Sequence, residues 1–166
     1  SSAASDVYKR QALAATSMGI KSVVCMPDGA PLMKVESTKR LGAQVELVKG
    51  TYDDAHDRAV ELQKETGMTF IHPYDDELVI AGQGTIGLEI LDQLPDVEAV
   101  VVPVGGGGLA AGVATLAKLL NPNVKVIGVE PTGAASMKAS LEAGHVVSLP
   151  TANTIADGTA VKTPGD

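Results

Sequence analysis

Aromatic residues and cysteine are the scarcest side chains in this sequence of 166 residues. The chain has three tyrosines, one phenylalanine, one cysteine and no tryptophan. A single cysteine excludes an intramolecular disulfide and a cysteine-rich zinc site, which fits a protein of the reducing cytoplasm. Apolar residues nevertheless make up 45% of the chain, so we expect a core of aliphatic side chains and alanine.

Clusters of basic residues and long hydrophobic runs are also missing. The formal net charge is −7, and no group of lysines and arginines is interleaved with aromatic residues, which argues against a nucleic-acid partner. The apolar runs are too short, and too often interrupted by glycine, to span a bilayer, and the N-terminus shows no signal peptide. We therefore expect a small-molecule ligand, with neither nucleic acid nor a membrane as a partner.

The chain alternates between short apolar runs and segments of helical composition. Such alternation is typical of parallel sheets whose faces are covered by helices, so the predicted fold class is α/β. The strands are expected at residues 21–26, 44–48, 68–72, 99–104, 125–130 and 146–149. The helices are expected at residues 12–18, 32–41, 51 or 53 to 66, 77–94, 109–120 and 134–143.

Glycine and polar residues mark the expected ends of several helices. Gly19 is expected to close the first helix. Thr51 or Asp53 is expected to cap the third helix, and Asp75 or Asp76 to cap the fourth.

A turn at residues 72–76 divides the alternation into two parts. We expect a small βα domain over residues 12–75 and part of a larger domain over residues 76–166. Residues 1–11 fit no periodic pattern, and both the first helix and the C-terminal segment look cut. We therefore expect a fragment, truncated at both ends, with an unrelated leader at residues 1–11.

Three glycines, at positions 82, 84 and 87, lie inside the helix expected at residues 77–94. A glycine in a helix interior costs about 1 kcal/mol relative to alanine. We therefore expect a second helix, or a loop that carries a ligand, to pack very close to this helix.

Four consecutive glycines, Gly105–Gly108, follow an apolar β-branched run and precede a helix rich in alanine and leucine. The run at residues 99–104 is interpreted as a strand buried on both faces. Glycine lets the backbone approach a ligand and turn its N–H groups inward, and the helix directs its positive end to the same point. The pattern predicts a cradle for an anion, most simply a phosphate, with a flexible turn as the alternative.

The spacing of this loop also satisfies a dinucleotide-binding pattern. Gly106, Gly108 and Ala111 match the sequence G-x-G-x-x-G/A. Glu130 ends the next predicted strand, where an acid that binds ribose is expected. Two features argue against a nicotinamide-dependent oxidoreductase: the loop follows the fourth expected strand, and it holds two glycines that the pattern does not need. That enzyme class stays open as an alternative, as does a non-catalytic binding module.

Five segments together resemble one family of enzymes. They are MPDGAPLMK at 26–34, HPYDD at 72–76, AGQGTIGLE at 81–89, VGGGGL at 104–109 and TIADG at 154–158. In combination and in order, they resemble the threonine dehydratases (threonine ammonia-lyases), pyridoxal-phosphate enzymes with the fold of the tryptophan-synthase β-subunit, called fold type II. Serine racemase has this fold and shares these motifs, so it stays open as an alternative.

The resemblance implies where the cofactor binds. Backbone N–H groups of the glycine loop would bind the phosphate of pyridoxal phosphate, in agreement with the cradle expected from the residues themselves. Asp157 and Gly158 resemble a loop that passes beside the cofactor ring, with an ordinary Asp-Gly turn as the alternative. The residues of the phosphate site would be Gly105, Gly106, Gly107, Gly108 and Leu109.

The resemblance also implies a site for a monovalent or divalent cation near the phosphate. Its ligands would be the carboxylate of Glu130, the backbone carbonyl of Ala134 and the side chain of Ser136, a small but chemically suitable set for a hard cation. The alternative is that Glu130 is solvated or bonded to the N-terminus of a helix.

No catalytic residue is expected in this sequence. Family members bind the cofactor through a lysine that lies N-terminal to all five segments, so the resemblance implies that this lysine is missing and that the chain alone is inactive. In the complete enzyme, which we expect to be a homo-oligomer, threonine or serine would lose its β-hydroxyl and give ammonia and a 2-oxo acid. Cys25 is expected to be a buried core thiol, and His56, His72 and His145 to be surface or structural histidines.

Overall fold

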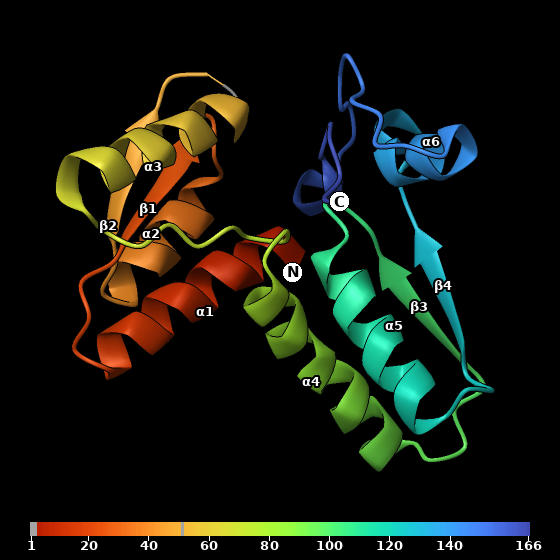
Figure 1. Ribbon diagram of the computed structural model, residues 1–166. Helices are drawn as coiled ribbons and strands as arrows, with labels where there is room; N and C mark the ends of the chain where they lie inside the picture. Colours follow the sequence, from red (N-terminus) through yellow and green to blue (C-terminus); the bar gives the residue numbers. More distant parts are fainter. Residues whose placement is uncertain (1–2, 51) are drawn as a thin grey trace. The chain divides into compact units, whose positions relative to one another are not determined.

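The computed structural model describes residues 3–50 and 52–166 and divides the chain into two compact units (Figure 1). The first unit contains Ser5–Ile71, and most of the second is His72–Asp166. Parallel strands and helices build both units, which confirms the predicted α/β class.

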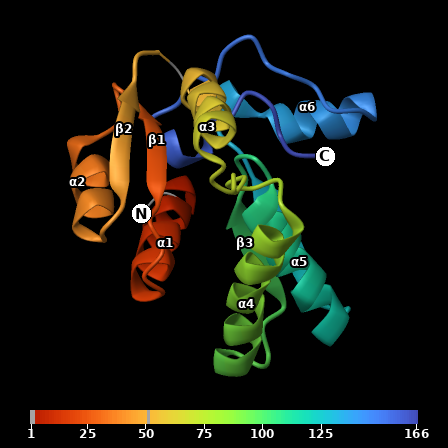
Figure 2. The same cartoon turned by 60° about the vertical axis from the view of Figure 1, so that its left-hand side comes forward.

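In the first unit, two parallel strands are accompanied by three helices. Figure 2 shows the strands side by side, with the helices around them. Their residues pair in register from Val23–Gln44 to Pro27–Val48. The elements are α1 (Ala3–Ser17), β1 (Val23–Pro27), α2 (Leu32–Arg40), β2 (Gln44–Val48) and α3 (Tyr52–Thr66).

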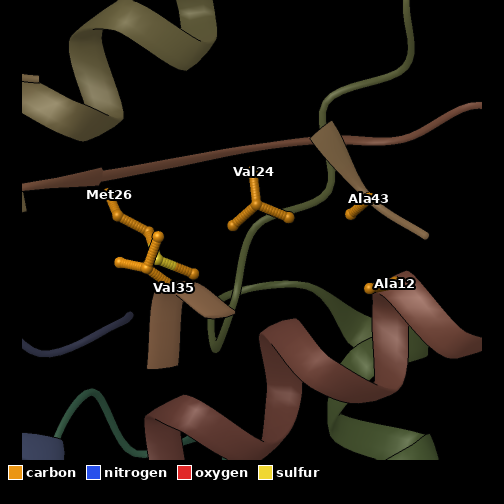
Figure 3. Packing of buried hydrophobic residues seen from close by; sticks show 5 residues of the cluster. All are labelled: Ala12, Val24, Met26, Val35 and Ala43. Atoms are coloured by element: carbon orange, nitrogen blue, oxygen red, sulfur yellow. The ribbon is translucent and has the colours of Figure 1, made fainter. Parts of the chain in front are cut away.

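The core of the first unit forms on one face of β1 (Figure 3). Val24 and Met26 point to the same side because side chains alternate along a strand. They pack with Ala12 of α1, Val35 of α2 and Ala43, and all five residues are buried. The five buried residues are aliphatic or alanine, as the composition led us to expect, and one aromatic residue, Tyr8 of α1, packs against them while partly exposed.

Helix α1 ends where the sequence predicts but begins much earlier. Gly19 has a φ of +69°, and the N–H of Ile20 donates to the carbonyl of Ala15 at 2.8 Å, which confirms Gly19 as the closing residue. The predicted start near residue 12 is wrong, because the helix begins at Ala3. Helix formation does not require an apolar repeat where the residues themselves favour a helix, as alanine, lysine, arginine and glutamine do here.

Two predicted strands are absent, and one predicted cap is wrong. Residues 68–72 and 146–149 are apolar but have no strand assignment. A strand needs a neighbour for its N–H and C=O groups, and neither segment joins the two sheets of the described chain. Asp53 lies within the first turn of α3 and therefore does not cap that helix. The other candidate cap, Thr51, lies outside the described residues.

The second unit contains a βαβ arrangement preceded by one long helix and followed by one short helix. Its two strands are parallel, and they pair from Ala99–Lys125 to Pro103–Val129. None of the helices in the described ranges is long and apolar enough to cross a membrane. The elements are α4 (Glu77–Gln93), β3 (Ala99–Pro103), α5 (Gly108–Leu120), β4 (Lys125–Val129) and α6 (Ser136–Ala143), with 3₁₀ turns η1 (Thr132–Ala134) and η2 (Asp157–Thr159).

Helices α4 and α5 lie along each other, as Figures 1 and 2 show. A Cβ atom added to Gly84 would lie 3.2 Å from the carbonyl oxygen of Gly112, and one added to Gly87 would lie 3.2 Å from that of Val113. A Cβ atom on Gly112 would lie 2.7 Å from the nitrogen of Gly84. The expectation that a second helix packs against these glycines is confirmed, except at Gly82, where the space is open.

Strand β3 is less buried than its apolar sequence predicts. Val102 is buried on the face that α5 covers, whereas Val101 on the opposite face is 64% exposed. The prediction of burial on both faces is therefore wrong for this chain. A continuous apolar run is typical of a strand that helices cover on both faces. In the part of the chain that the structure describes, a helix covers only one face of β3.

Candidate functional site

The glycine loop joins β3 to α5 and ends in a left-handed turn. The N–H of Val104 donates to the carbonyl of Val129 at 2.9 Å, which anchors the loop at the end of the sheet. Gly107 has a φ of +103°, occupies the N-cap position of α5 and makes no side-chain capping bond. The N–H groups of the first helical turn and the positive end of the helix dipole are therefore directed at the loop without an intervening cap side chain.

The glycines of the loop are required by packing as well as by backbone conformation. A Cβ atom at Gly106 would overlap the ring of Tyr74, and one at Gly108 would lie 2.9 Å from the Cα of the same tyrosine. A Cβ atom at Gly105 would lie 3.2 Å from Cγ2 of Val161. Larger residues at these positions would force the loop away from its neighbours.

The C-terminal segment lies against the same loop. Turn η2 buries Gly158 and Thr159, and the carbonyl oxygen of Gly158 would lie 3.3 Å from a Cβ atom on Gly105. The N–H of Gly165 donates to the carbonyl of Gly106 at 2.9 Å. The predicted turn at Asp157–Gly158 is thus confirmed, and the fold brings Gly158 next to the glycine loop.

Glu130 caps helix α6. Its Oε1 accepts from the N–H of Met137 at 2.9 Å, and its Oε2 accepts from the N–H of Lys138 at 2.8 Å. These bonds match the alternative of a carboxylate bonded to a helix N-terminus. These bonds give Glu130 a role within the protein that does not depend on a bound ribose.

Comparison with known proteins identifies the family. Residues 11–166 match the family described as pyridoxal-phosphate dependent enzyme. The chain belongs to this family. It is 54% identical over 155 residues to the L-threonine ammonia-lyase of Thermotoga maritima, a match that covers 93% of this chain and 39% of that protein.

Solved structures of family members have the same fold. The processed form of threonine deaminase isoform 2 from Solanum lycopersicum superposes with a TM-score of 0.86 at 49% identity, covering 93% of this chain and 45% of that one. Maize serine racemase superposes with a TM-score of 0.87 at 39% identity, covering 93% and 47%. The fold is therefore that of the fold-type-II pyridoxal-phosphate enzymes, and the chain spans less than half of these relatives.

The residues of the glycine loop fit the phosphate of the family's cofactor. A phosphate dianion binds well at a helix N-terminus, where backbone N–H groups and the helix dipole favour negative charge. Gly107 leaves that end of α5 without a side chain, and Leu109 follows in the first helical turn. The assignment of individual residues to the cofactor stays a prediction.

The predicted cation site contains one carboxylate. Ala134 and Ser136 are buried near the start of α6, and the Ser136 hydroxyl donates to the carbonyl of Val161 at 3.1 Å. Among the residues that the structure describes, no group of three or more histidine, cysteine, aspartate or glutamate side chains could hold a metal ion. A cation at Glu130 would therefore depend mainly on carbonyl and hydroxyl oxygens, and this site stays a prediction.

The cysteine and one histidine have structural surroundings. Cys25 is only partly buried and does not belong to the core cluster, so the prediction of a buried core thiol is wrong. Burial nevertheless raises the pKa of the Cys25 thiol, with a further increase from Glu46 and an opposing effect of Arg58. Nδ1 of His72 accepts from the N–H of Asp75 at 2.9 Å and holds the turn before α4.

Sequence reasoning missed Tyr74 as a neighbour of the glycine loop. The motif HPYDD contributed to the family resemblance and to the prediction that Asp75 or Asp76 caps α4. Asp76 is the cap, because its side chain accepts from the N–H groups of Leu78 and Val79 at 2.8 and 3.1 Å. The available signal was the aromatic residue itself. A tyrosine carries a large apolar ring with one polar end, so a tyrosine in a polar turn indicates a packing contact.

Proposed function

We propose that this chain forms the cofactor-phosphate-binding part of a pyridoxal-phosphate-dependent threonine ammonia-lyase. The observation that carries the proposal is the 54% identity to an L-threonine ammonia-lyase over 93% of the chain. The glycine loop at the N-terminus of α5, which suits a phosphate, supports it. The whole enzyme would convert threonine or serine to ammonia and a 2-oxo acid.

The residues of this chain would bind and orient the cofactor. Backbone N–H groups of Gly105–Leu109 would hold the phosphate, and Gly158 would lie beside the ring. The cofactor, when bound, supplies the electron sink for chemistry at the substrate α-carbon. Glu130, Ala134 and Ser136 would bind a cation, for which the carboxylate has lone pairs beyond those used by α6.

Binding of three ligands to the 166-residue chain tests the phosphate site. Pyridoxal phosphate should shift the amide resonances of the loop at 105–109, whereas pyridoxal, which lacks the phosphate, should bind far more weakly. NADH should leave these resonances unchanged. Equal binding of pyridoxal, or shifts confined to other residues, would contradict the proposed site.

A matched pair of variants separates local from general effects. Gly107→Ala introduces a side chain at a φ of +103°, and Gly144→Ala does so at +73° at the end of α6. Both changes strain the backbone by about 1 kcal/mol, and Gly107→Ala also brings a Cβ atom within 2.7 Å of the flexible end of Met137. Only Gly107→Ala should weaken pyridoxal phosphate binding.

The chain alone is expected to release no ammonia from threonine, because the resemblance places the cofactor-binding lysine outside this sequence. The complete enzyme would act in the cytoplasm as a homo-oligomer, on an amino acid and without a nucleic-acid partner. A covalent adduct between pyridoxal phosphate and a lysine of this chain, together with ammonia release, would refute the expected inactivity.

Serine racemase is the second candidate, because the maize enzyme has the same fold. Its 39% identity is lower than the 54% found for the ammonia-lyase. A protein that carries this sequence at the full length of its relatives should release ammonia from L-threonine faster than it converts L-serine to D-serine. The reverse order of rates would favour the racemase.

A further inference from the structure

Tyr74 contacts the glycine loop at two places. The three atoms nearest to a Cβ atom built on Gly106 are ring carbons of Tyr74, so the Cα of Gly106 lies on the face of this ring. The backbone of Tyr74 comes close to Gly108, where a Cβ atom would lie 2.9 Å from the Cα of Tyr74. At two of the four loop glycines, a larger residue would therefore clash with Tyr74.

Tyr74 is itself fixed from three directions. Its hydroxyl donates to the carbonyl of Thr163 at 3.2 Å. Its ring meets the ring of His72 edge to face, with centroids 4.6 Å apart. Two residues later Asp76 begins α4, which packs closely along α5. The N-terminus of α4, the N-terminus of α5 and the C-terminal segment thus all lie next to Tyr74.

The C-terminal segment also holds Gly106. The carbonyl of Gly106 accepts from the N–H of Gly165 at 2.9 Å. Gly106 therefore lies between a ring on one side and a hydrogen bond on another, and it has little freedom to move.

From these contacts we infer that Tyr74 is a positioning residue that holds the glycine loop in its anion-binding conformation. The link to the cofactor rests on the proposed function. Gly106 is glycine because of the Tyr74 ring and not because of its backbone angles, since it is not among the glycines with positive φ. An alanine at this position is disfavoured only while the ring is present.

A double-mutant cycle on the 166-residue chain tests this inference. Gly106→Ala should weaken pyridoxal phosphate binding roughly tenfold, because the added methyl group would strike the ring of Tyr74 and displace the loop. A tenfold change lies within the range of interaction energies measured between residues in direct contact. Tyr74→Ala should weaken binding because the loop is released. In the Tyr74→Ala background, adding Gly106→Ala should have no further effect, since the ring that it would strike is gone.

Two further variants distinguish positioning from general stability. Tyr74→Phe keeps the ring and should retain the affinity of the native chain. Gly82→Ala adds the same methyl group in open space of the same unit and should leave binding unchanged. Additive effects of Gly106→Ala and Tyr74→Ala, or a Tyr74→Phe variant as weak as Tyr74→Ala, would overturn the inference.

A measurement without ligand separates this inference from the proposed function. For the same variants, Gly106→Ala, Tyr74→Ala and the double variant, we would measure the urea midpoint of unfolding and the amide resonances of Gly105–Gly108 without ligand. If the effects of Gly106→Ala and Tyr74→Ala on these measurements are not additive, but no variant binds pyridoxal phosphate, the proposed function would be refuted and the role of Tyr74 would stand. Binding by the native chain without any coupling would refute the role of Tyr74 alone.

Discussion

A charged contact holds helix α3 in the first unit, whereas backbone contacts join helices α4 and α5 in the second unit. In the first unit, Arg58 of α3 donates from Nε to Glu46 of β2 at 2.6 Å and from a terminal nitrogen to Glu65 at 3.0 Å. In the second unit, α4 and α5 meet at Gly84 and Gly112, where the backbones approach closely. Charged side chains are long and adaptable, whereas a backbone contact tolerates no added atom.

The proposed phosphate site lies in the unit with close backbone contacts. A loop that binds an anion through N–H groups needs its backbone held in one conformation. Glycines permit close backbone contacts in the loop itself and between helices α4 and α5. The difference between the units therefore predicts which substitutions the protein tolerates, and the following variants test it.

The largest effect is expected for Gly112→Val. Its side chain would overlap the carbonyl of Ile80 and the nitrogen of Gly84, which are backbone atoms and cannot rotate away. We expect a loss of about 3 kcal/mol in the free energy of unfolding, measured by amide hydrogen exchange in the second unit. Gly82→Ala is the control and should gain about 0.5–1 kcal/mol. Equal effects of the two variants would show that α4 and α5 do not meet through their backbones.

A smaller effect is expected for Asp76→Ala at the start of α4. The change removes the acceptor for the N–H groups of Leu78 and Val79 and should cost about 1 kcal/mol. Asp75→Ala removes the exposed neighbouring carboxylate and should cost less than about 0.5 kcal/mol. Urea unfolding of both variants measures the difference. The cap assignment fails if the loss at Asp75 is the larger one.

Arg58→Ala should destabilise the first unit by less than Asp76→Ala destabilises the second. The carboxylates of Glu46, Glu65 and Glu61 raise the pKa of Arg58, so the guanidinium keeps its charge. Arg58 and Glu46 are partly exposed, and salt screens ion pairs that solvent reaches, so the difference in urea midpoint from the native chain should shrink in about 1 M salt. Lys39→Ala, which breaks a single exposed pair with Glu36, should show almost no change. A salt-independent effect of Arg58→Ala would indicate packing instead of charge.

The smallest effect concerns the titration of Cys25. Because burial raises the pKa of the thiol, the pH midpoint of its alkylation by iodoacetamide should lie above that of free cysteine. The stabilisation from the protonated thiol is complete below the ordinary thiol pKa and is lost as the pH rises through the higher folded value. Arg58→Ala should move the midpoint further upward, since Arg58 lowers this pKa. A midpoint below that of free cysteine would contradict the burial of the thiol.

The sequence by itself determined the elements that depend on local chemistry. Parallel α/β units, the end of α1 at Gly19, the cap at Asp76 and the turn at Asp157–Gly158 follow from residue types and spacing. The glycine run between a strand and a helix predicts an anion site from residue types and their order alone. The motifs and their order indicated the family correctly.

Only the tertiary structure decided what depends on neighbours distant in the chain. Residues 68–72 and 146–149 have strand-like sequences but no hydrogen-bonding partner strand among the described residues, and Val101 is apolar but uncovered. Glu130 serves the N-terminus of α6, and the ring of Tyr74 lies on Gly106. Local propensity is contained in a few adjacent residues, whereas pairing, burial and close packing are properties of two segments that the fold brings together.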